Sequence, residues 1–141
     1  MKKIIIILLI FIVVLCILLY NFNSIALDKQ KVAEENAEFE QFLNKEIYGI
    51  DIASIINKAV DKNIKNGIKK DDKDFFIQND ENSIEIEVYL TEGDDIYKME
   101  QIYKLGTEQF VQFFIDAKFK STDVQYHDKT GRIKYILFEQ I

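Results

Sequence analysis

Residues 4–20 read IIIILLIFIVVLCILLY, a run of 17 apolar residues without a charge. A helix rises about 1.5 Å per residue, so the run covers roughly 25 Å, whereas the hydrocarbon core of a bilayer is about 30 Å thick. The mild stretch at residues 21–27, NFNSIAL, lets the same helix continue into the headgroup layer, where Tyr20 and Phe22 suit the interface. The sequence therefore predicts a membrane anchor at residues 1–27, with residues 4–20 in contact with lipid.

The charges that flank this run predict its orientation. Lys2 and Lys3 precede it, whereas Asp28, Glu34 and Glu35 follow it beside two lysines. By the positive-inside rule the N-terminus then faces the cytoplasm. Abundant Ile, Lys and Asn suit an AT-rich bacterial genome. We therefore expect a single-pass protein of a bacterial cytoplasmic membrane, with the N-terminus inside and the folded part outside.

A cleaved secretory signal peptide is the alternative to an anchor. Ser24 and Ala26 have small side chains at the spacing that signal peptidase requires. The apolar run, however, exceeds the roughly 7 to 15 residues of a typical signal-peptide core, and this favours an uncleaved anchor. A lipoprotein anchor is not expected, because the residue before Cys16 is Leu15 and a lipidated cysteine follows a small residue.

The composition of the remaining chain excludes several classes of protein. Lys2 and Lys3 are two of the 18 basic residues, so the chain beyond residue 20 has 16 basic side chains against 24 acidic ones. This excess of negative charge argues against nucleic acid as a partner. One Cys, one His and no Pro leave no disulfide framework, Cys/His zinc site or proline-rich segment.

Helical periodicity continues beyond the membrane run. Four apolar residues recur at helical spacing among glutamates: Val32, Phe39, Phe42 and Leu43. They predict an amphipathic helix that reaches about Tyr48 before Gly49 interrupts it. A second helix is expected over residues 51–63, with Asn66-Gly67 as its stop. Residues 28–68 would thus form a helical region.

The pattern changes to a strand period near residue 69. The alternation in residues 83–90 and the turn formers at residues 79–82 predict a hairpin with residues 74–78. A second hairpin is expected at the end of the chain, around Gly131. Its last strand has apolar residues on both faces, which predicts a central position: Ile133, Tyr135 and Leu137 on one face, Ile136 and Phe138 on the other.

An aromatic stripe predicts one helix between the two hairpins, from Met99 to Ala117, with Asp94 or Asp95 as its N-cap. The expected fold class is α+β. A membrane helix would continue into an amphipathic helix, followed by a small four-stranded, mainly antiparallel sheet with a packed helix, in the order α-α-β-β-α-β-β. Residues 69–141 would form the sheet-plus-helix region of the same extracytoplasmic domain as residues 28–68.

Few residues indicate chemistry. Ser121, Asp123 and His127 resemble a triad in type, but Ser121 and His127 would lie roughly 20 Å apart on an extended strand, and catalytic partners approach to about 3 Å. We expect His127 to be exposed at a hairpin corner. The acidic stretches at residues 71–74 and 92–95 lack the spacing of a calcium loop, although calcium binding by them stays open. No catalytic, cofactor or metal site is predicted, and we expect that the protein is not an enzyme.

A single N-terminal span that runs into a long helix and then a small antiparallel sheet resembles type IV pilins and pseudopilins. The prepilin processing motif, a Gly followed by an aromatic residue or Met and then a Glu, is absent from residues 1–10, MKKIIIILLI. Three short stretches are similar to small single-pass envelope proteins of Gram-positive bacteria: YGIDI at 48–52, INKA at 56–59 and YHDKTG at 126–131. The first resemblance implies assembly with other subunits, and the second carries no known activity.

We therefore predict a membrane-anchored, extracytoplasmic structural or protein-interaction component of the bacterial cell envelope. The candidate partner-binding residues are Val32, Phe39, Phe42 and Leu43, and the partner is another protein or a second copy of the chain. The alternative is an extracytoplasmic ligand-binding module, secreted if the N-terminal segment is cleaved. That alternative requires a pocket between the aromatic helix and the sheet.

Overall fold

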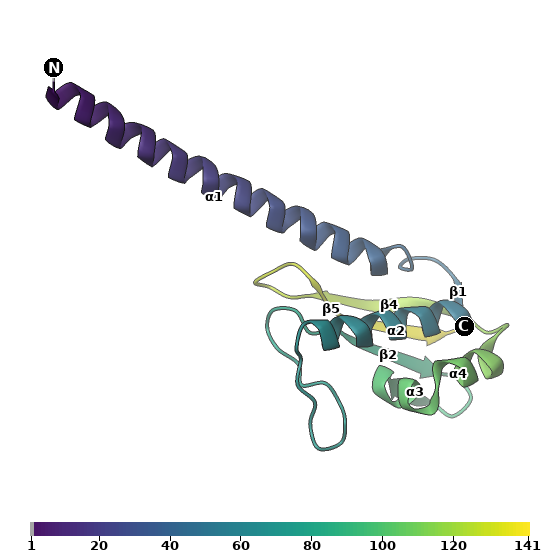
Figure 1. The fold of residues 1–141 in the computed structure, drawn as a ribbon. Helices are drawn as coiled ribbons and strands as arrows, with labels where there is room; N and C mark the ends of the chain where they lie inside the picture. Colours follow the sequence, from purple (N-terminus) through teal and green to yellow (C-terminus); the bar gives the residue numbers. More distant parts are fainter. Residues whose placement is uncertain (1) are drawn as a thin grey trace. The chain divides into compact units, whose positions relative to one another are not determined.

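The computed structural model describes residues 2–141 and divides into two compact units, Met1–Glu34 and Glu35–Ile141 (Figure 1). We call the second unit the domain. The first helix, α1, runs over Lys2–Glu40, so its last residues belong to the domain. Within residues 2–141, α1 is the one helix long and apolar enough to cross a membrane. The predicted α+β class with a long apolar N-terminal helix is confirmed.

Helix α1 ends eight residues earlier than the predicted boundary at Tyr48. A turn follows Glu40, and Ile47–Tyr48 form a short edge strand, β1, that pairs with Lys118 and Phe119. Pairing with that strand buries Ile47 in the core. The local helical period could not show this end, because the pairing partner lies some 70 residues further along the chain.

The predicted second helix is confirmed as α2, Gly49–Lys65. Its apolar stripe is fully buried: Ile52, Ile55, Ile56, Ala59 and Val60. Gly49 begins this helix rather than only interrupting the first one. A side chain at Gly49 would meet the backbone carbonyl of Phe114, so glycine allows the two segments to approach closely. Gly67, with a φ of 68°, follows the helix at its C-terminus.

The sheet differs from the predicted one in strand number and in one pairing. It has five strands in the order β1-β4-β5-β2-β3. The remaining strands are β2 (Glu85–Leu90), β3 (Asp95–Lys98), β4 (Lys118–Tyr126) and β5 (Ile133–Gln140). Strands β2 and β5 pair in parallel, so the sheet is mixed rather than mainly antiparallel. The segment from β3 to β4 supplies the long crossover that a parallel pair requires.

The first predicted hairpin is wrong. Residues 74–78 form no strand and only an isolated bridge between Lys70 and Phe76. The hairpin partner of β2 is instead β3, which follows it directly. The turn at residues 79–82 does form. The side-chain oxygen of Asn79 stabilises it by accepting hydrogen bonds from the backbone N–H groups of Glu81, Asn82 and Ser83.

The predicted aromatic helix is two helices, α3 (Met99–Leu105) and α4 (Thr107–Phe114). They are separated at Gly106, whose φ of 102° is one that other residues rarely adopt. The prediction of Asp94 or Asp95 as N-cap is also wrong, because residues 95–98 are occupied by β3. The helix begins after Lys98, whose backbone N–H donates to the side chain of Gln101.

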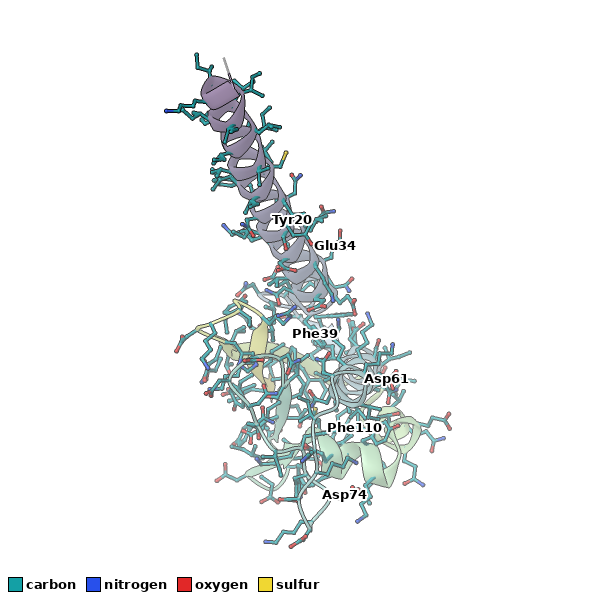
Figure 2. All side chains as sticks on the ribbon, turned by 60° about the vertical axis from the view of Figure 1, so that its left-hand side comes forward. Tyr20, Glu34, Phe39, Asp61, Asp74 and Phe110 are labelled. Carbon is teal, nitrogen blue, oxygen red and sulfur yellow. The ribbon has the colours of Figure 1, made fainter. Side chains whose placement is uncertain are left out.

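The central position of the last strand is confirmed, since β5 lies between β4 and β2. Helices α2, α3 and α4 all lie on one face of the sheet, where Ile136 and Phe138 are completely buried (Figure 1). The apolar residues on the two faces of β5 are not equally covered. Tyr135 and Leu137 point to the other face and are half-buried among charged side chains. Figure 2 shows Phe39 and Phe110 inside the packed domain, with Asp61 and Asp74 at its surface.

Candidate functional site

An apolar cleft lies between α3, α4 and the ends of β2 and β3. Its volume is about 400 Å³. The residues that line it include no charged side chain: Leu90, Tyr97, Ile102, Leu105, Gly106, Gln109, Phe110, Phe113 and Phe114. We call this feature the α3–α4 cleft. It is the kind of pocket, between the aromatic helices and the sheet, that the ligand-binding alternative requires.

The break at Gly106 creates this cleft by turning α4 away from the line of α3. Phe110 and Phe114 then face the core, with ring centroids 4.8 Å apart, and both approach Phe119 of β4. Phe113 stays 82% exposed, and Leu105 stays 69% exposed. The aromatic stripe therefore lies only partly in the core. The stripe was expected on one continuous helix, whereas it is divided between two short helices.

Acidic side chains dominate the segments around the cleft. Leu90, which lines it, is paired in the β-ladder with Asp95. The turn between these two strands adds exposed Glu92 and Asp94. The Asp94 carboxylate accepts a hydrogen bond of 2.6 Å from the Tyr89 hydroxyl, and this bond raises the pKa of that phenol. Exposed Asp116 follows the end of α4, and Lys104 is the single basic residue of residues 99–116. Glu108 lines a different pocket, between α4 and α2.

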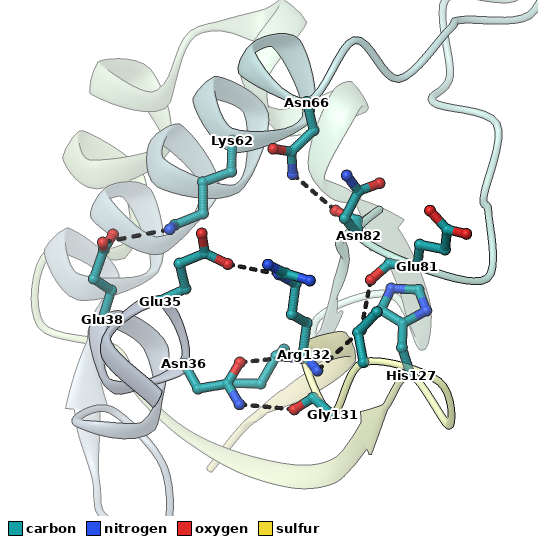
Figure 3. Close-up of polar contacts among 12 residues, drawn as sticks. Glu35, Asn36, Glu38, Lys62, Asn66, Glu81, Asn82, His127, Gly131 and Arg132 are labelled. Carbon is teal, nitrogen blue, oxygen red and sulfur yellow. Dashed lines mark hydrogen bonds and ion pairs between the residues drawn. The ribbon is translucent and has the colours of Figure 1, made fainter. Parts of the chain in front are cut away.

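A polar cluster surrounds Arg132 in the turn between β4 and β5 (Figure 3). Its guanidinium Nε lies 2.7 Å from the carboxylate of Glu35. The amide of Asn36 donates to the carbonyl of Gly131 and accepts from the N–H of Ile133, each at 2.9 Å. These charged and polar groups are already paired with one another. The cluster therefore holds the last turns of α1 to the domain.

The only histidine, His127, is buried rather than exposed as predicted. It is 3% exposed, and its Nε2 lies 2.7 Å from the carbonyl oxygen of Ser83. The turn that follows His127 packs on the loop at residues 79–83, where Thr130 donates to the carbonyl of Glu81. Ser121 has a different partner, since its hydroxyl accepts from the N–H of Asn44. Ser121 and His127 thus bond to different partners, Asn44 and Ser83.

The acidic stretches do not come together as a metal site. Within residues 2–141, no three His, Cys, Asp or Glu side chains are grouped so as to hold a metal ion. Asp71 instead closes its own turn by accepting from the N–H groups of Lys73 and Phe75. Asp74 pairs with Lys70 at 3.0 Å. These carboxylates serve local turns and surface ion pairs.

The uncovered face of the sheet has an ordered network of charges. Lys98 pairs with Glu85 and Glu87 across β3 and β2, and its hydrogen bond to Glu85 is the main reason that its pKa is raised. The Tyr135 hydroxyl donates to Glu87 at 2.8 Å. Partial burial, followed by this hydrogen bond, raises the pKa of Tyr135 strongly. Both shifts favour the protonated forms, so Lys98 is positively charged and Tyr135 is neutral at neutral pH.

The four predicted partner-binding residues are distributed over different environments. Val32 lies in α1 in the first unit. Phe39 is 1% exposed and belongs to the domain core, whereas Phe42 and Leu43 pack against that core and are partly exposed. Phe39 therefore serves the fold of its own chain. Sequence reasoning missed the α3–α4 cleft, although Gly106 inside a helical pattern was a signal of a break.

Comparisons with protein-family models, with curated proteins and with solved structures gave no match.

Proposed function

We propose that this chain is a membrane-anchored, extracytoplasmic interaction component of the bacterial cell envelope and not an enzyme. The observation that carries this proposal is the combination of one membrane-length apolar helix with a compact domain that has an exposed apolar cleft. Exposed apolar surface of this kind is typical of binding sites. The domain acts by binding another macromolecule, and self-association in a pilus-like assembly is one form of that activity.

The anchor and its orientation are supported by the charges at its two ends. Lys2 and Lys3 precede the apolar run, and acidic residues follow it. An N-terminal signal sequence can also be long and apolar enough to form such a helix, so cleavage is the competing outcome. The orientation places the domain outside the cytoplasmic membrane.

Protease treatment of intact protoplasts tests the topology. The chain is expressed with a C-terminal epitope tag in a Gram-positive host, and a cytoplasmic protein serves as the protected control. We expect protease to remove the tag and leave a membrane-bound stub. Protection of the tag would contradict the orientation. Release of the tagged domain into the medium, prevented by Ala26→Lys, would instead show a cleaved signal peptide.

Site-specific photo-crosslinking in native membranes tests the interaction role. A photoreactive residue is placed singly at positions 42, 61 and 113, which sample the end of α1, α2 and the cleft. We expect a protein adduct from at least one position, detected by its mobility and identified by mass spectrometry. If no position gives a protein adduct and the chain does not associate with itself, the interaction role is contradicted.

A ligand-binding module is the second candidate function, and the α3–α4 cleft is the observation that favours it. Its volume of about 400 Å³ lies within the range of small-molecule sites. Native mass spectrometry of the purified chain tests this alternative. A stoichiometric apolar molecule that is lost in Phe110→Ala would support it, whereas an empty chain would contradict it.

A further inference from the structure

We propose that the α3–α4 cleft binds a basic amphipathic peptide segment of a partner protein. This inference rests on the proposed function as an interaction component, and it adds the place of binding and the chemistry of the partner. Three features carry it: the shape of the cleft, the apolar side chains exposed at its mouth, and the charge of the segments around it.

The mouth of the cleft has anchors that the domain itself does not use. Phe113 is 82% exposed and Leu105 is 69% exposed, although both line the cleft. Exposing two large apolar side chains at one cleft is unfavourable unless a partner covers them. A helix that inserts apolar residues at positions i, i+3, i+4 and i+7 into such a groove covers them efficiently.

The negative charge around the cleft favours a positively charged partner. Asp95 is paired with the cleft residue Leu90, Glu92 lies exposed in the turn between them, and exposed Asp116 follows the end of α4. The domain as a whole repeats this bias. Four of the 18 basic and two of the 24 acidic residues precede Glu35, so the domain has 14 basic against 22 acidic side chains, a net charge of −8. A Lys- or Arg-rich polar face therefore complements this surface.

The same charges disfavour two other occupants. Phosphate head groups of anionic lipid would face the acidic turn and be repelled. A second copy of this chain would bring the same acidic segments and the same net charge against them, and like charges across an interface are costly. A basic amphipathic peptide has neither penalty.

A binding assay with defined peptides tests the proposal. The full chain is placed in phosphatidylcholine nanodiscs, and empty nanodiscs serve as the blank. The probe is a fluorescent 18-residue peptide of Leu and Lys with its Leu residues at helical spacing. Its two matched controls are the same peptide with Glu in place of Lys, and a peptide of equal composition without the helical period. We expect binding of the Leu/Lys peptide alone, measured by anisotropy, and weaker binding as salt is raised.

Two matched pairs of variants localise the binding. Phe113→Ser is compared with Ile64→Ser, because Ile64 is a large apolar residue, 58% exposed, in α2 and outside the cleft. We expect about tenfold weaker binding for Phe113→Ser and no change for Ile64→Ser. Glu92→Lys with Asp95→Lys is compared with Asp72→Lys and Asp128→Lys, which make the same change of charge elsewhere. Only the first double variant should lose affinity beyond the effect of net charge.

Several results would overturn the proposal. Equal binding of the Leu/Glu peptide would remove the charge argument, and equal affinities of Phe113→Ser and Ile64→Ser would remove the cleft. Phe113-dependent energy transfer between labelled copies would assign the cleft to self-association. Phe113-dependent adsorption to phosphatidylglycerol vesicles would assign it to a membrane surface. Crosslinks from positions 42 or 61 but not from 113 would leave the interaction role standing while refuting this assignment.

Discussion

Tyr135 illustrates how a half-buried residue links the fold to pH. Its hydroxyl donates to Glu87, and partial burial together with Glu87, Asp123 and Glu85 raises the pKa of the phenol above its usual value of about 10. The folded state therefore holds this proton more tightly than the unfolded state does. The stability that results is fully present below about pH 10 and is lost as the pH rises further. Lys98, whose pKa is also raised, contributes in the same direction.

We expect Tyr135→Phe to weaken this alkaline dependence. Removing the hydroxyl should lower the free energy of unfolding by about 0.5 to 1.5 kcal/mol at neutral pH, because one hydrogen bond is lost. Above pH 10 the difference from the original chain should shrink, since the variant has no phenol to ionise at this position. Denaturant unfolding at several pH values measures both effects. Tyr103→Phe, at an exposed position on α3, is the control and should follow the original chain.

At the scale of elements, the two faces of β5 have different roles although both are apolar in sequence. Phe138 is completely buried under the three helices, whereas Leu137 is only half-buried on the uncovered face. The charged side chains of Glu85, Glu87 and Lys98 share that uncovered face with it. One face therefore holds the core together, and the other is a solvent-accessible surface.

Serine substitutions at adjacent positions of β5 test this asymmetry. Phe138→Ser should lower the free energy of unfolding by about 3 to 5 kcal/mol, because a large core side chain is lost and a hydroxyl is buried in its place. Leu137→Ser should cost only about 1 kcal/mol, because this side chain is already partly hydrated. Denaturant unfolding monitored by tyrosine fluorescence gives both values. Equal losses would mean that a partner or another part of the chain covers the second face.

At the scale of the whole molecule, the boundary between the two units lies inside α1. The domain begins at Glu35, and the following turns of α1 contribute Asn36 and Phe39 to it. The apolar segment before that boundary is therefore separable in principle, whereas the last turns of the same helix are not. The hydrogen bonds of Asn36 and the burial of Phe39 tie the end of α1 to the domain.

Two truncations should separate these roles. A chain of residues 28–141 should fold as a soluble domain, because it keeps Glu35, Asn36 and Phe39. A chain of residues 41–141 should be less stable by at least 3 kcal/mol, because the buried ring of Phe39 and both Asn36 hydrogen bonds are lost. Circular dichroism and denaturant unfolding compare the two. Comparable stability of the shorter chain would show that the end of α1 is dispensable.

The features that the sequence determined by itself are those of local periodicity. The run at residues 4–20 specifies a membrane-length helix, and the stripe of α2 specifies its buried face. Gly131 between two apolar strands specifies the last hairpin, and apolar residues on both faces of β5 place it centrally. Each of these signals lies within about 20 residues, because a repeat shows which side chains of one segment share a face.

Only the tertiary structure decided which of these faces meet. The end of α1 depends on Ile47 pairing with Phe119, and the parallel pairing of β2 with β5 joins segments about 50 residues apart. The burial of His127 depends in the same way on the distant carbonyl of Ser83. The α3–α4 cleft arises where Gly106 breaks a pattern that alone predicts one helix. A sequence repeat shows which face of a segment is apolar. Which other segment packs on that face depends on contacts between parts of the chain that no local pattern connects.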